Sequence, residues 1–330
     1  MLAVGPNGAG KTNLLESLHV ATQGFSPRTR SDAQLIRFGA EGARVEVAGE
    51  HGGTDVEIEV TLKTGEAKRA LVNGSPLRAA EELRSRLPTL VFTPDRLAIV
   101  KGGPAVRRAY FDRTLGRLFP SRAPTATDYA SALAQRNGAL RRVAAGYSSR
   151  DALEPWTRQV AELGRLLVAA RGQLVELLSP VFAECAAEFG LEEAALEYEG
   201  RPLSAKELEA RLEQDLARGF TGAGPHLHDV AVVAGARDLR NFGSQGEQRL
   251  AVLSLLFAEA DLLTKRGPSP PLLLLDDVLS ELDPDRRATL AARVRRPGGQ
   301  AFLTATSAAA LPDAADVLVE VTSGRAVRAT

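Results

Sequence analysis

The first strongly patterned segment of the chain is a short amphipathic stretch near its start. Leu14, Leu15 and Leu18 fall on one face of an α-helical repeat, and Gly24 follows the last apolar position. Apolar residues spaced three and four apart are typical of a helix with one buried face, and glycine is a common helix stop. The pattern predicts a helix over residues 13–23.

The next segment changes to a period of two. Apolar and polar residues alternate in three runs, which lie at residues 44–47, 56–60 and 70–72. Glycine-containing turns separate these runs, so residues 44–73 are predicted to form an antiparallel meander with one exposed face. A short helix over residues 79–87 and a returning strand over 90–92 are expected next.

A long helical block follows the meander. From Phe111 to about Leu216 the pattern is almost wholly helical. Apolar residues recur at helical spacing within 129–143 and again within 156–178, and a turn at 146–150 separates them. Two such stretches fold most simply as an antiparallel pair. Trp156, the single tryptophan, is expected in the core between them.

The last third of the chain returns to an α/β pattern. A long helix is predicted from Ser244 to about Leu263. The continuous apolar run Leu272–Leu275 has the length of a fully buried strand, and residues 301–306 form a second apolar strand. Helices alternating with such runs are typical of a parallel sheet covered by helices.

Composition narrows the class of protein. The chain has 330 residues, of which 44% are hydrophobic, enough for one large domain or two lobes. Its 41 basic residues balance 41 acidic ones, so DNA binding would have to depend on local patches. A single cysteine, Cys185, excludes a disulfide framework and suits a core position in a reducing cytosol. No apolar run is expected to span a membrane, and no signal peptide precedes residue 5; the predicted location is cytoplasmic.

The clearest chemical motif lies between the first apolar residues and the first helix. It matches the phosphate-binding loop pattern GxxxxGK[ST] at every fixed position, over Gly5, Pro6, Asn7, Gly8, Ala9, Gly10, Lys11 and Thr12. Glycines let successive backbone N–H groups face a polyphosphate beside a helix N-terminus. Lys11 is expected at the β and γ phosphates and Thr12 at Mg²⁺, with Asn13 completing the ATP-binding set. The alternative is a glycine-rich turn that caps an ordinary helix.

A pair of carboxylates follows the buried strand Leu272–Leu275. Asp276 lies where a parallel sheet presents its ligands, and it is expected to hold Mg²⁺ together with Thr12. Asp277 points elsewhere and is the candidate that orients or deprotonates the attacking water. The alternative is a polar strand end that faces solvent, which leaves paired charges beside four leucines at a high desolvation cost.

A third motif begins the helix at Ser244. Ser244 and Glu247 fit a capping box, in which each side chain bonds the backbone N–H of the other residue. Gly246 favours a second role, because glycine is unfavourable in a helix but lets a phosphate approach the backbone. Ser244, Gly246 and Gln248 are therefore also candidates for contact with ATP.

Basic residues mark candidate contacts with DNA. The adjacent Arg107 and Arg108 fall in the first turn of a helix and oppose its dipole, so we expect an anion beside them, either carboxylates of this chain or a nucleotide or DNA phosphate. The remaining candidates lie in a basic loop and on the helical block, where a solvated surface is the alternative. They are Arg28, Arg30, Arg136, Arg141 and Arg142.

The start of the chain is unusually close to the phosphate loop. Only Leu2-Ala3-Val4 precede Gly5, whereas such a loop normally follows a central strand that has an earlier neighbour. We expect the assigned start to be late, with one or two strands missing; the alternative is a fold that tolerates their loss.

Together, the phosphate loop, the Asp276-Asp277 pair and Ser244-Gln245-Gly246-Glu247 resemble the motif set of ABC-type ATPases, whose signature usually reads Ser-Gly-Gly-Gln. In that class, the signature of one subunit closes on the γ phosphate bound by another. The resemblance implies a head-to-tail homodimer with two ATP molecules between the subunits.

Within that class the chain resembles the RecF family. The segments that carry the likeness are 94–112, Tyr129 with Gln135-Arg136-Asn137, Gly224-Pro225-His226, and 274–290 with Ser280-Glu281-Leu282-Asp283. They occur in the family's order and cover essentially the whole chain. The long insertion between Thr12 and Ser244 also suits this branch better than a transporter subunit.

This resemblance implies an α/β fold: an ABC-type P-loop ATPase head, with a mixed sheet and an antiparallel β meander, and an inserted all-helical arm domain. The head is expected over residues 1–112 and 217–330, and the arm over 113–216. The implied activity is slow hydrolysis of ATP, with Mg²⁺, coupled to dimerisation on single-stranded and gapped duplex DNA. The implied partners are RecR and RecO mediators and, indirectly, the recombinase RecA.

By position, the resemblance gives Asp277 and Lys11 catalytic roles and places Asp283 in a loop facing the dimer partner. The chain departs from the family pattern in several places. Leu227-His228-Asp229 stand where the family continues Arg-Asp-Asp, and Thr306 takes the place of the switch histidine of ABC ATPases, which suits slow turnover. Asp277 stands where the wider class has glutamate, although RecF proteins have aspartate.

Three other functions predict different features. The head of a long coiled-coil ATPase requires hundreds of heptad residues between its lobes, far more than this chain contains. A transporter ATPase requires a membrane partner and brisk turnover. An ATP-controlled binding module with vestigial hydrolysis differs from the RecF reading mainly in rate.

Overall fold

The computed structural model describes residues 1–29, 31–51, 53–77, 83–84 and 87–329. These residues form two compact units. Unit 1 comprises Met1–Arg96 and Ala260–Thr330, and unit 2 comprises Leu97–Glu259. The boundaries expected between head and arm, at residues 112–113 and 216–217, remain a prediction. The predicted helix over 79–87 falls largely outside the described residues.

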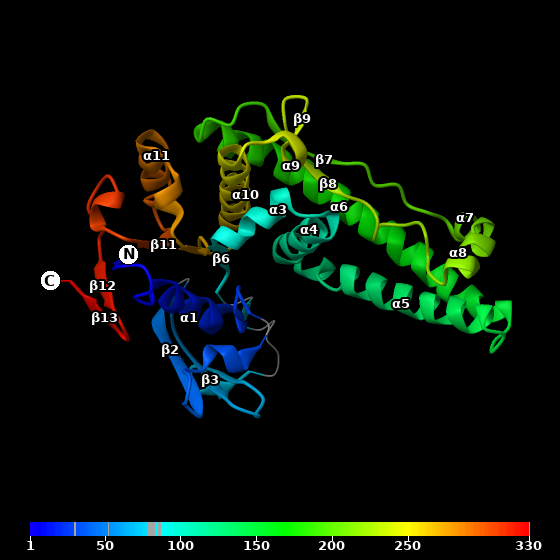
Figure 1. The fold of residues 1–330 in the computed structure, drawn as a ribbon, viewed down its shortest axis with the longest axis horizontal. Helices are drawn as coiled ribbons and strands as arrows, with labels where there is room; N and C mark the ends of the chain where they lie inside the picture. The colour runs from blue at the N-terminus through cyan, green and yellow to red at the C-terminus, as the bar shows by residue number, and fades with distance from the viewer. Residues whose placement is uncertain (30, 52, 78–82, 85–86, 330) are drawn as a thin grey trace. The chain divides into compact units, whose positions relative to one another are not determined.

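Unit 1 contains a six-stranded sheet in the order β13-β12-β1-β11-β10-β6 (Figure 1). Four of its five pairings are parallel, and β13 runs antiparallel to β12 at one edge. The strands are β1 (Leu2–Val4), β6 (Thr89–Phe92), β10 (Leu272–Leu275), β11 (Gln300–Ala305), β12 (Leu318–Thr322) and β13 (Arg325–Arg328). The predicted strands over 90–92, 272–275 and 301–306 are confirmed.

The helix α1 (Lys11–Gln23) packs its apolar face against this sheet. Leu15 meets Ala3, Leu274 and Phe302 in one buried cluster. Gly24 closes the helix in a left-handed conformation (φ 75°), as the sequence predicts. The helix α11 (Pro284–Val294) begins at Asp283, whose side chain accepts a hydrogen bond from the N–H of Arg286.

The predicted meander is confirmed as a second sheet of unit 1. It has the order β2-β3-β4-β5, all antiparallel, over Gly42–His51, Thr54–Lys63, Arg69–Val72 and Ser75–Pro76. Alternate residues such as Ile58 and Val60 bury one face against Val20 of α1. The opposite face remains exposed because its positions are polar.

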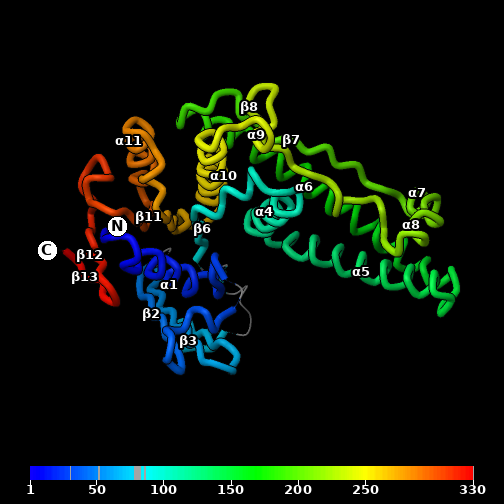
Figure 2. Tube along the Cα trace, in the orientation of Figure 1, coloured from blue at the N-terminus to red at the C-terminus, as the bar shows by residue number. Residues whose placement is uncertain are grey.

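Unit 2 is built on two long antiparallel helices that run side by side (Figures 1 and 2). They are α5 (Thr125–Ala144) and α6 (Glu154–Glu188), and the predicted pair is thereby confirmed. Tyr129 near one end of α5 packs with Leu167, whereas Leu140 near the other end packs with Leu153. Trp156 is partly buried against the second of these clusters.

The other elements of unit 2 surround this pair. They are α3 (Ala98–Lys101), α4 (Pro104–Leu118), β7 (Ala194–Tyr198), α7 (Ala205–Ala210), α8 (Leu212–Arg218), β8 (Val230–Ala234), β9 (Arg237–Asp238) and α9 (Leu239–Phe242). The helix α10 (Gln245–Arg266) begins in unit 2 and ends in unit 1. Short 3-10 turns connect several elements, at Asp32–Leu35, Pro94–Leu97, Pro120–Arg122, Arg150–Leu153, Val278–Glu281 and Ala308–Ala310.

One sequence expectation for unit 2 is wrong. The block from Phe111 to Leu216 is not wholly helical, because β7 pairs with β8 in a three-stranded sheet. Its alanines and glutamate favour strands only weakly, so burial against β8 decides the conformation. The helical segment Arg150–Glu188, which includes α6, is long and apolar enough by length and composition alone to cross a membrane, a test that a core helix also passes. Its buried Arg171 is paired with Asp112 of α4, as expected for a core helix of a globular unit.

A buried ion pair fastens the connection after α8 to the helix pair. The Arg136 guanidinium donates to Asp215 Oδ2 (2.8 Å) and to Thr221 Oγ1 (2.6 Å), and the neighbouring Asn137 side chain accepts from the Thr221 N–H (2.8 Å). Arg136 and Asp215 are 0% and 1% exposed. The prediction that Arg136 contacts DNA is therefore wrong, because its charge is buried and neutralised within unit 2.

Removing the acidic partner tests the importance of this pair. Asp215→Ala leaves the Arg136 charge buried without a counterion, so the free energy of unfolding is expected to fall by about 3–5 kcal/mol in urea titrations. Glu213→Ala is the matched control, since Glu213 pairs with Arg150 at the surface and its loss should cost less than about 1 kcal/mol. Equal effects of the two changes would contradict this account.

Candidate nucleotide-binding site

The loop between β1 and α1 has the backbone of a phosphate cradle. Gly8 and Gly10 adopt positive φ angles of 81° and 107°, which residues with a side chain rarely adopt. A Cβ atom added at Gly5 would lie 2.2 Å from the carbonyl oxygen of Val321, so this position also requires glycine. Backbone geometry therefore requires glycine at all three positions of the phosphate-loop pattern. A turn that only caps a helix would not need all three.

Lys11 occupies the interior of this loop. Its side chain is largely buried, and Nζ donates to the carbonyl oxygens of Gly5 (2.8 Å) and Pro6 (3.0 Å). These two bonds fix a positive charge inside the loop at the start of α1. An ammonium group carries three donors, so one donor remains for a further acceptor. Ala9 is buried in the core, whereas Pro6, Asn7, Gly8 and Asn13 are exposed.

Thr12 and Asp276 are brought together from opposite ends of the chain. Thr12 Oγ1 donates to Asp276 Oδ1 at 3.1 Å, which is the pairing expected from the sequence. Hydroxyl and carboxylate oxygens are hard ligands, and Mg²⁺ is usually bound by one or two carboxylates plus phosphate oxygens. The donor set fits Mg²⁺ in that mode. Within the described part of the chain, no cluster of three or more His, Cys, Asp or Glu side chains forms a separate metal site.

Asp277 has an unusual backbone for a residue other than glycine. Its φ and ψ are 51° and 28°, a left-handed conformation that costs about 1–3 kcal/mol. Its N–H donates to Thr304 Oγ1 at 2.9 Å, and its carbonyl oxygen accepts from Ser280 Oγ at 2.9 Å. Asp277 therefore leaves the direction of β10 directly after Asp276, as the sequence argument expected.

Ser244 forms the predicted capping box at the start of α10. The Glu247 N–H donates to Ser244 Oγ (3.2 Å), and the Ser244 N–H donates to the Glu247 carboxylate (2.8 Å). The Ser244 N–H, together with Arg237, lowers the pKa of Glu247, so its carboxylate stays ionised. The Ser244 hydroxyl also donates to the Glu247 carboxylate, which can only accept, so the capping residue and its partner share this proton.

Two neighbours of Ser244 have different environments. Gly246 is exposed in the first turn of α10, where a phosphate could approach its backbone. Gln248 is buried, and its amide donates to the carbonyl oxygen of Leu239 at 2.8 Å. The prediction that the Gln248 side chain contacts ATP is therefore wrong; it fixes the start of α10 against α9.

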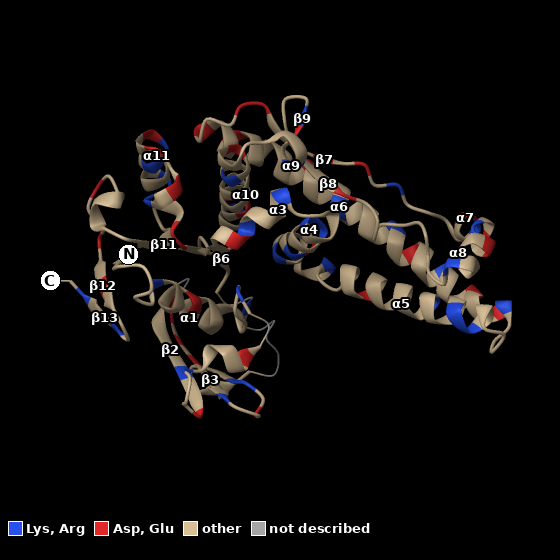
Figure 3. Cartoon of the chain, in the orientation of Figure 1, with Lys and Arg blue, Asp and Glu red and all other residues tan. Residues whose placement is uncertain are grey.

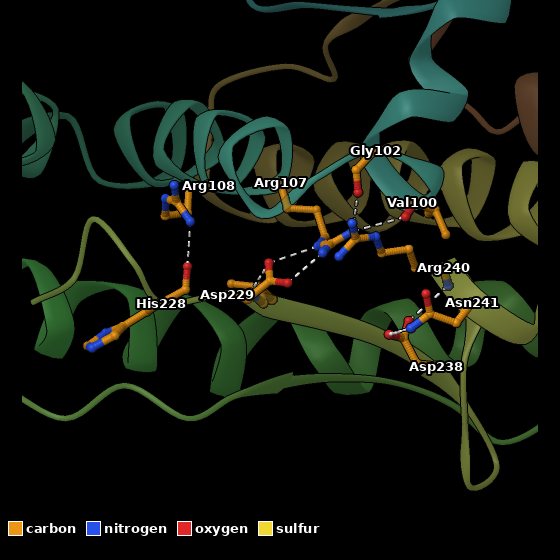
Figure 4. A network of polar contacts seen from close by, with 10 residues as sticks. Val100, Gly102, Arg107, Arg108, His228, Asp229, Asp238, Arg240 and Asn241 are labelled. Atoms are coloured by element: carbon orange, nitrogen blue, oxygen red, sulfur yellow. Dashed lines mark hydrogen bonds and ion pairs between the residues drawn. The ribbon is translucent and has the colours of Figure 1, made fainter. Parts of the chain in front are cut away.

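The two arginines at the start of α4 have different partners within the chain (Figure 4). Arg107 donates to both oxygens of Asp229 and to the carbonyl oxygens of Val100 and Gly102. Its side chain is only 3% exposed, so the expectation that it contacts DNA is wrong. Arg108 donates to the carbonyl oxygen of His228 (2.7 Å) and is half-buried.

The remaining basic candidates stay predictions. Arg141 and Arg142 are exposed in the last turn of α5, and Figure 3 shows Lys and Arg on that end of the helix and on α8. Arg28 is partly exposed and lies 3.5 Å from the Glu16 carboxylate of α1. Arg30 lies outside the described residues. Thr306 is exposed just past the end of β11.

Sequence reasoning missed the residues that complete these arrangements. Thr304 bonds both the Asp276 side chain and the Asp277 backbone, and Asp229 and Asp215 neutralise Arg107 and Arg136. Each contact joins residues far apart in the chain. A hydroxyl within an apolar strand was the one available signal for Thr304.

The fold and this site together define an ABC-type P-loop ATPase head. The RecF/RecN/SMC N terminal domain family matches residues 1–329. Proteins named "DNA replication and repair protein RecF" are 36% identical in Heliobacterium modesticaldum (92% of this chain, 85% of the relative) and 37% identical in Myxococcus xanthus (95% and 86%). The chain belongs to the RecF family.

Solved structures agree with this assignment. A structure described as the recombination mediator protein RecF bound to ATP in the RecFOR pathway is 28% identical, with a TM-score of 0.86 over 100% of this chain and 91% of the other. An Smc head domain from Pyrococcus furiosus is 17% identical with a TM-score of 0.58 over 100% and 89%, a likeness of fold alone. The predicted fold class is confirmed.

A histidine in the Gly224-Pro225-His226 segment is expected to make the stability of unit 2 depend on pH. Its Nε2 donates to the carbonyl oxygen of Thr221 (3.0 Å), which leaves Nδ1 to accept from the Tyr129 hydroxyl (2.7 Å). The ring is therefore neutral. Burial, with smaller contributions from Arg108 and Arg171, lowers the pKa of His226.

Protonation of His226 is easier in the unfolded chain, where its pKa is about 6.5. Its contribution to stability is therefore present above about pH 6.5 and is lost as pH falls from there toward the lower pKa of the folded state. We expect the free energy of unfolding to decrease between about pH 7 and pH 5.5, and His226→Gln to flatten this slope. Leu227→Ala, which changes an exposed neighbour without a titratable group, should keep it. An unchanged slope in His226→Gln would show that His226 is not responsible.

Proposed function

We propose that this protein is an ATP-dependent DNA-binding protein of recombinational repair. In this proposal it dimerises with ATP on gapped or single-stranded–duplex junction DNA, helps RecR- and RecO-type mediators to load the recombinase RecA, and hydrolyses ATP slowly. The single observation that carries it is the 3.1 Å contact of Thr12 with Asp276 beside a complete phosphate loop. Membership of the RecF family and the names of its relatives support the repair role.

ATP binding follows from the loop. The polyphosphate would be surrounded by the N–H groups of residues 8–13 at the positive end of α1. Lys11 would exchange the carbonyl oxygens of Gly5 and Pro6 for the β and γ phosphates, a stronger charge-assisted interaction at an already buried position. Thr12 and Asp276 would provide oxygen ligands to Mg²⁺, which supplies charge neutralisation of the phosphates when bound.

Hydrolysis needs a group that orients water. Asp277 follows Asp276 directly, and its left-handed backbone turns its side chain away from the strand direction. A carboxylate there can accept a hydrogen bond from the attacking water. Slow turnover is proposed because Thr306 stands where the histidine of faster ABC ATPases would be, and a hydroxyl is a weaker general base.

Dimerisation follows from Ser244 and Gly246, which we propose contact the γ phosphate bound by a second subunit. Their exposure at the start of α10 supports this role, in which the Ser244 hydroxyl would exchange its bond to the Glu247 carboxylate for one to the phosphate. An interface that includes two nucleotides forms only when ATP is bound, and hydrolysis releases it. DNA would bind through local basic contacts such as Arg141 and Arg142, since the chain has no net charge.

The Lys11→Met variant tests this function. Methionine keeps most of the length of the side chain and removes the charge that binds the β and γ phosphates, so dimer formation with ATP should be lost on a sizing column with light scattering. The variant should still fold, because the positive charge it removes bonds only two loop carbonyls. Glu213→Ala again serves as a control that should dimerise normally. Dimerisation of Lys11→Met equal to that of the unchanged protein would refute the proposed ATP-driven step.

A further inference from the structure

Thr304 lies on the strand that separates the two halves of the nucleotide site. The strand β11 is paired on one side with β1, which leads into the phosphate loop, and on the other with β10, which ends at Asp276. Thr304 is aligned with Ala3 of β1 and is completely buried. A polar side chain at the centre of an apolar sheet has to satisfy its hydrogen bonds inside the protein.

The Thr304 hydroxyl forms two hydrogen bonds, and their directions are fixed. The Asp277 N–H can only donate, so it occupies an acceptor position of Oγ1 at 2.9 Å. The hydroxyl proton is then directed to Asp276 Oδ1 at 2.7 Å, the same oxygen that accepts from Thr12. One side chain thus holds the carboxylate of one aspartate and the backbone of the next.

The hold on Asp277 matters because its left-handed conformation is unfavourable for aspartate. The N–H is bonded to Thr304 and the carbonyl oxygen to Ser280, so both sides of the residue are fixed. If the bond to Thr304 were lost, the peptide between Asp276 and Asp277 could rotate. Both carboxylates would then lose the orientation that the strand edge gives them.

We propose that Thr304 is a positioning residue for ATP hydrolysis: its hydroxyl sets the orientation of the Asp276 carboxylate beside Thr12 and the backbone turn that directs Asp277. This inference rests on the proposed function, since it assigns Asp276 to Mg²⁺ and Asp277 to the attacking water. Thr304 itself touches neither nucleotide nor metal in this account. Its effect passes through the two aspartates.

Two substitutions separate the hydroxyl from the packing of the side chain. Thr304→Val keeps the branched shape of threonine, suits a β-strand and removes both hydrogen bonds. Thr304→Ser keeps the hydroxyl and removes only a methyl group. A role in positioning predicts that serine preserves function and valine does not, whereas a role in packing predicts the reverse.

The first readout is steady-state ATP hydrolysis. Groups that orient a metal ligand typically contribute 10- to 100-fold, so kcat of Thr304→Val should fall by about that factor. KM for ATP should change less than kcat, since the phosphate loop and Lys11 are intact. Thr304→Ser should stay close to the unchanged protein in both parameters.

The second readout does not depend on turnover. ATP bound to the protein should raise the unfolding temperature further when Mg²⁺ is added, and the Mg²⁺ concentration needed for half of that increase reports on the metal ligands. It should rise about 10- to 100-fold in Thr304→Val and not in Thr304→Ser. If valine prevents folding, Thr304→Cys provides a second side chain without a hydroxyl for both readouts.

The outcomes distinguish this inference from the proposed function. Turnover and Mg²⁺ response of Thr304→Val equal to those of the unchanged protein would overturn the role of Thr304 and leave the proposed function standing. A loss in Thr304→Ser as large as in Thr304→Val would also overturn it, because the hydroxyl alone would then not preserve function. An unchanged protein that neither binds nor hydrolyses ATP would overturn both.

Discussion

The order of three neighbouring strands is the constraint on which the nucleotide site of unit 1 depends. The strands β1 and β10 flank β11 in parallel, so their carboxyl ends meet at one edge of the sheet. The phosphate loop leaves the first and Asp276 leaves the second, which brings Thr12 within 3.1 Å of a carboxylate 264 positions away in the chain. Without this order the loop would have no acidic partner for a metal. Apolar packing of Leu15, Leu274 and Phe302 behind the edge keeps the order in place.

A second constraint governs the charges of unit 2. Burying an arginine is costly unless a carboxylate and further acceptors surround it, and three arginines there meet this condition. Arg107, Arg136 and Arg171 each pair with an aspartate and each also bonds a neutral oxygen, a backbone carbonyl or a threonine hydroxyl. Two of these aspartates, Asp215 and Asp229, lie close in sequence to the Gly224-Pro225-His226 segment. The arginines therefore fix this irregular segment against α4, α5 and α6, and only exposed ones such as Arg141 remain for a polyanion.

Sequence reasoning succeeded where a local pattern determines the structure. The spacing of glycine, lysine and threonine in the phosphate loop, the alternation in the meander and the helical repeats of α5 and α6 each depend on neighbours in the chain. It failed where a distant partner decides the outcome. The sequence around Arg136 is that of a surface arginine, and only the fold places Asp215 beside it. Gln248 likewise lies within the signature motif, and only the fold shows that its amide donates to Leu239.

Two further misses have the same physical origin. The strand β7 contains two alanines and a glutamate, which favour strands only weakly, and its partner β8 lies about 35 positions later, so the tertiary pairing defines it. Thr304 is important only because β11 lies between β1 and β10, an order that the strand pattern alone does not fix. The Ser244 box shows a different case, since Ser244 caps α10 and yet stays exposed, so its contact with a phosphate remains a proposal.

The measurement that tests the central claim most directly is fluorescence anisotropy of labelled gapped duplex DNA titrated with this protein, with ATP, with ADP and without nucleotide. Tight binding is expected with ATP only, and added salt should weaken it because exposed arginines contact the phosphates. Equal affinity in all three conditions, or no binding in any of them, would contradict an ATP-controlled DNA-binding protein.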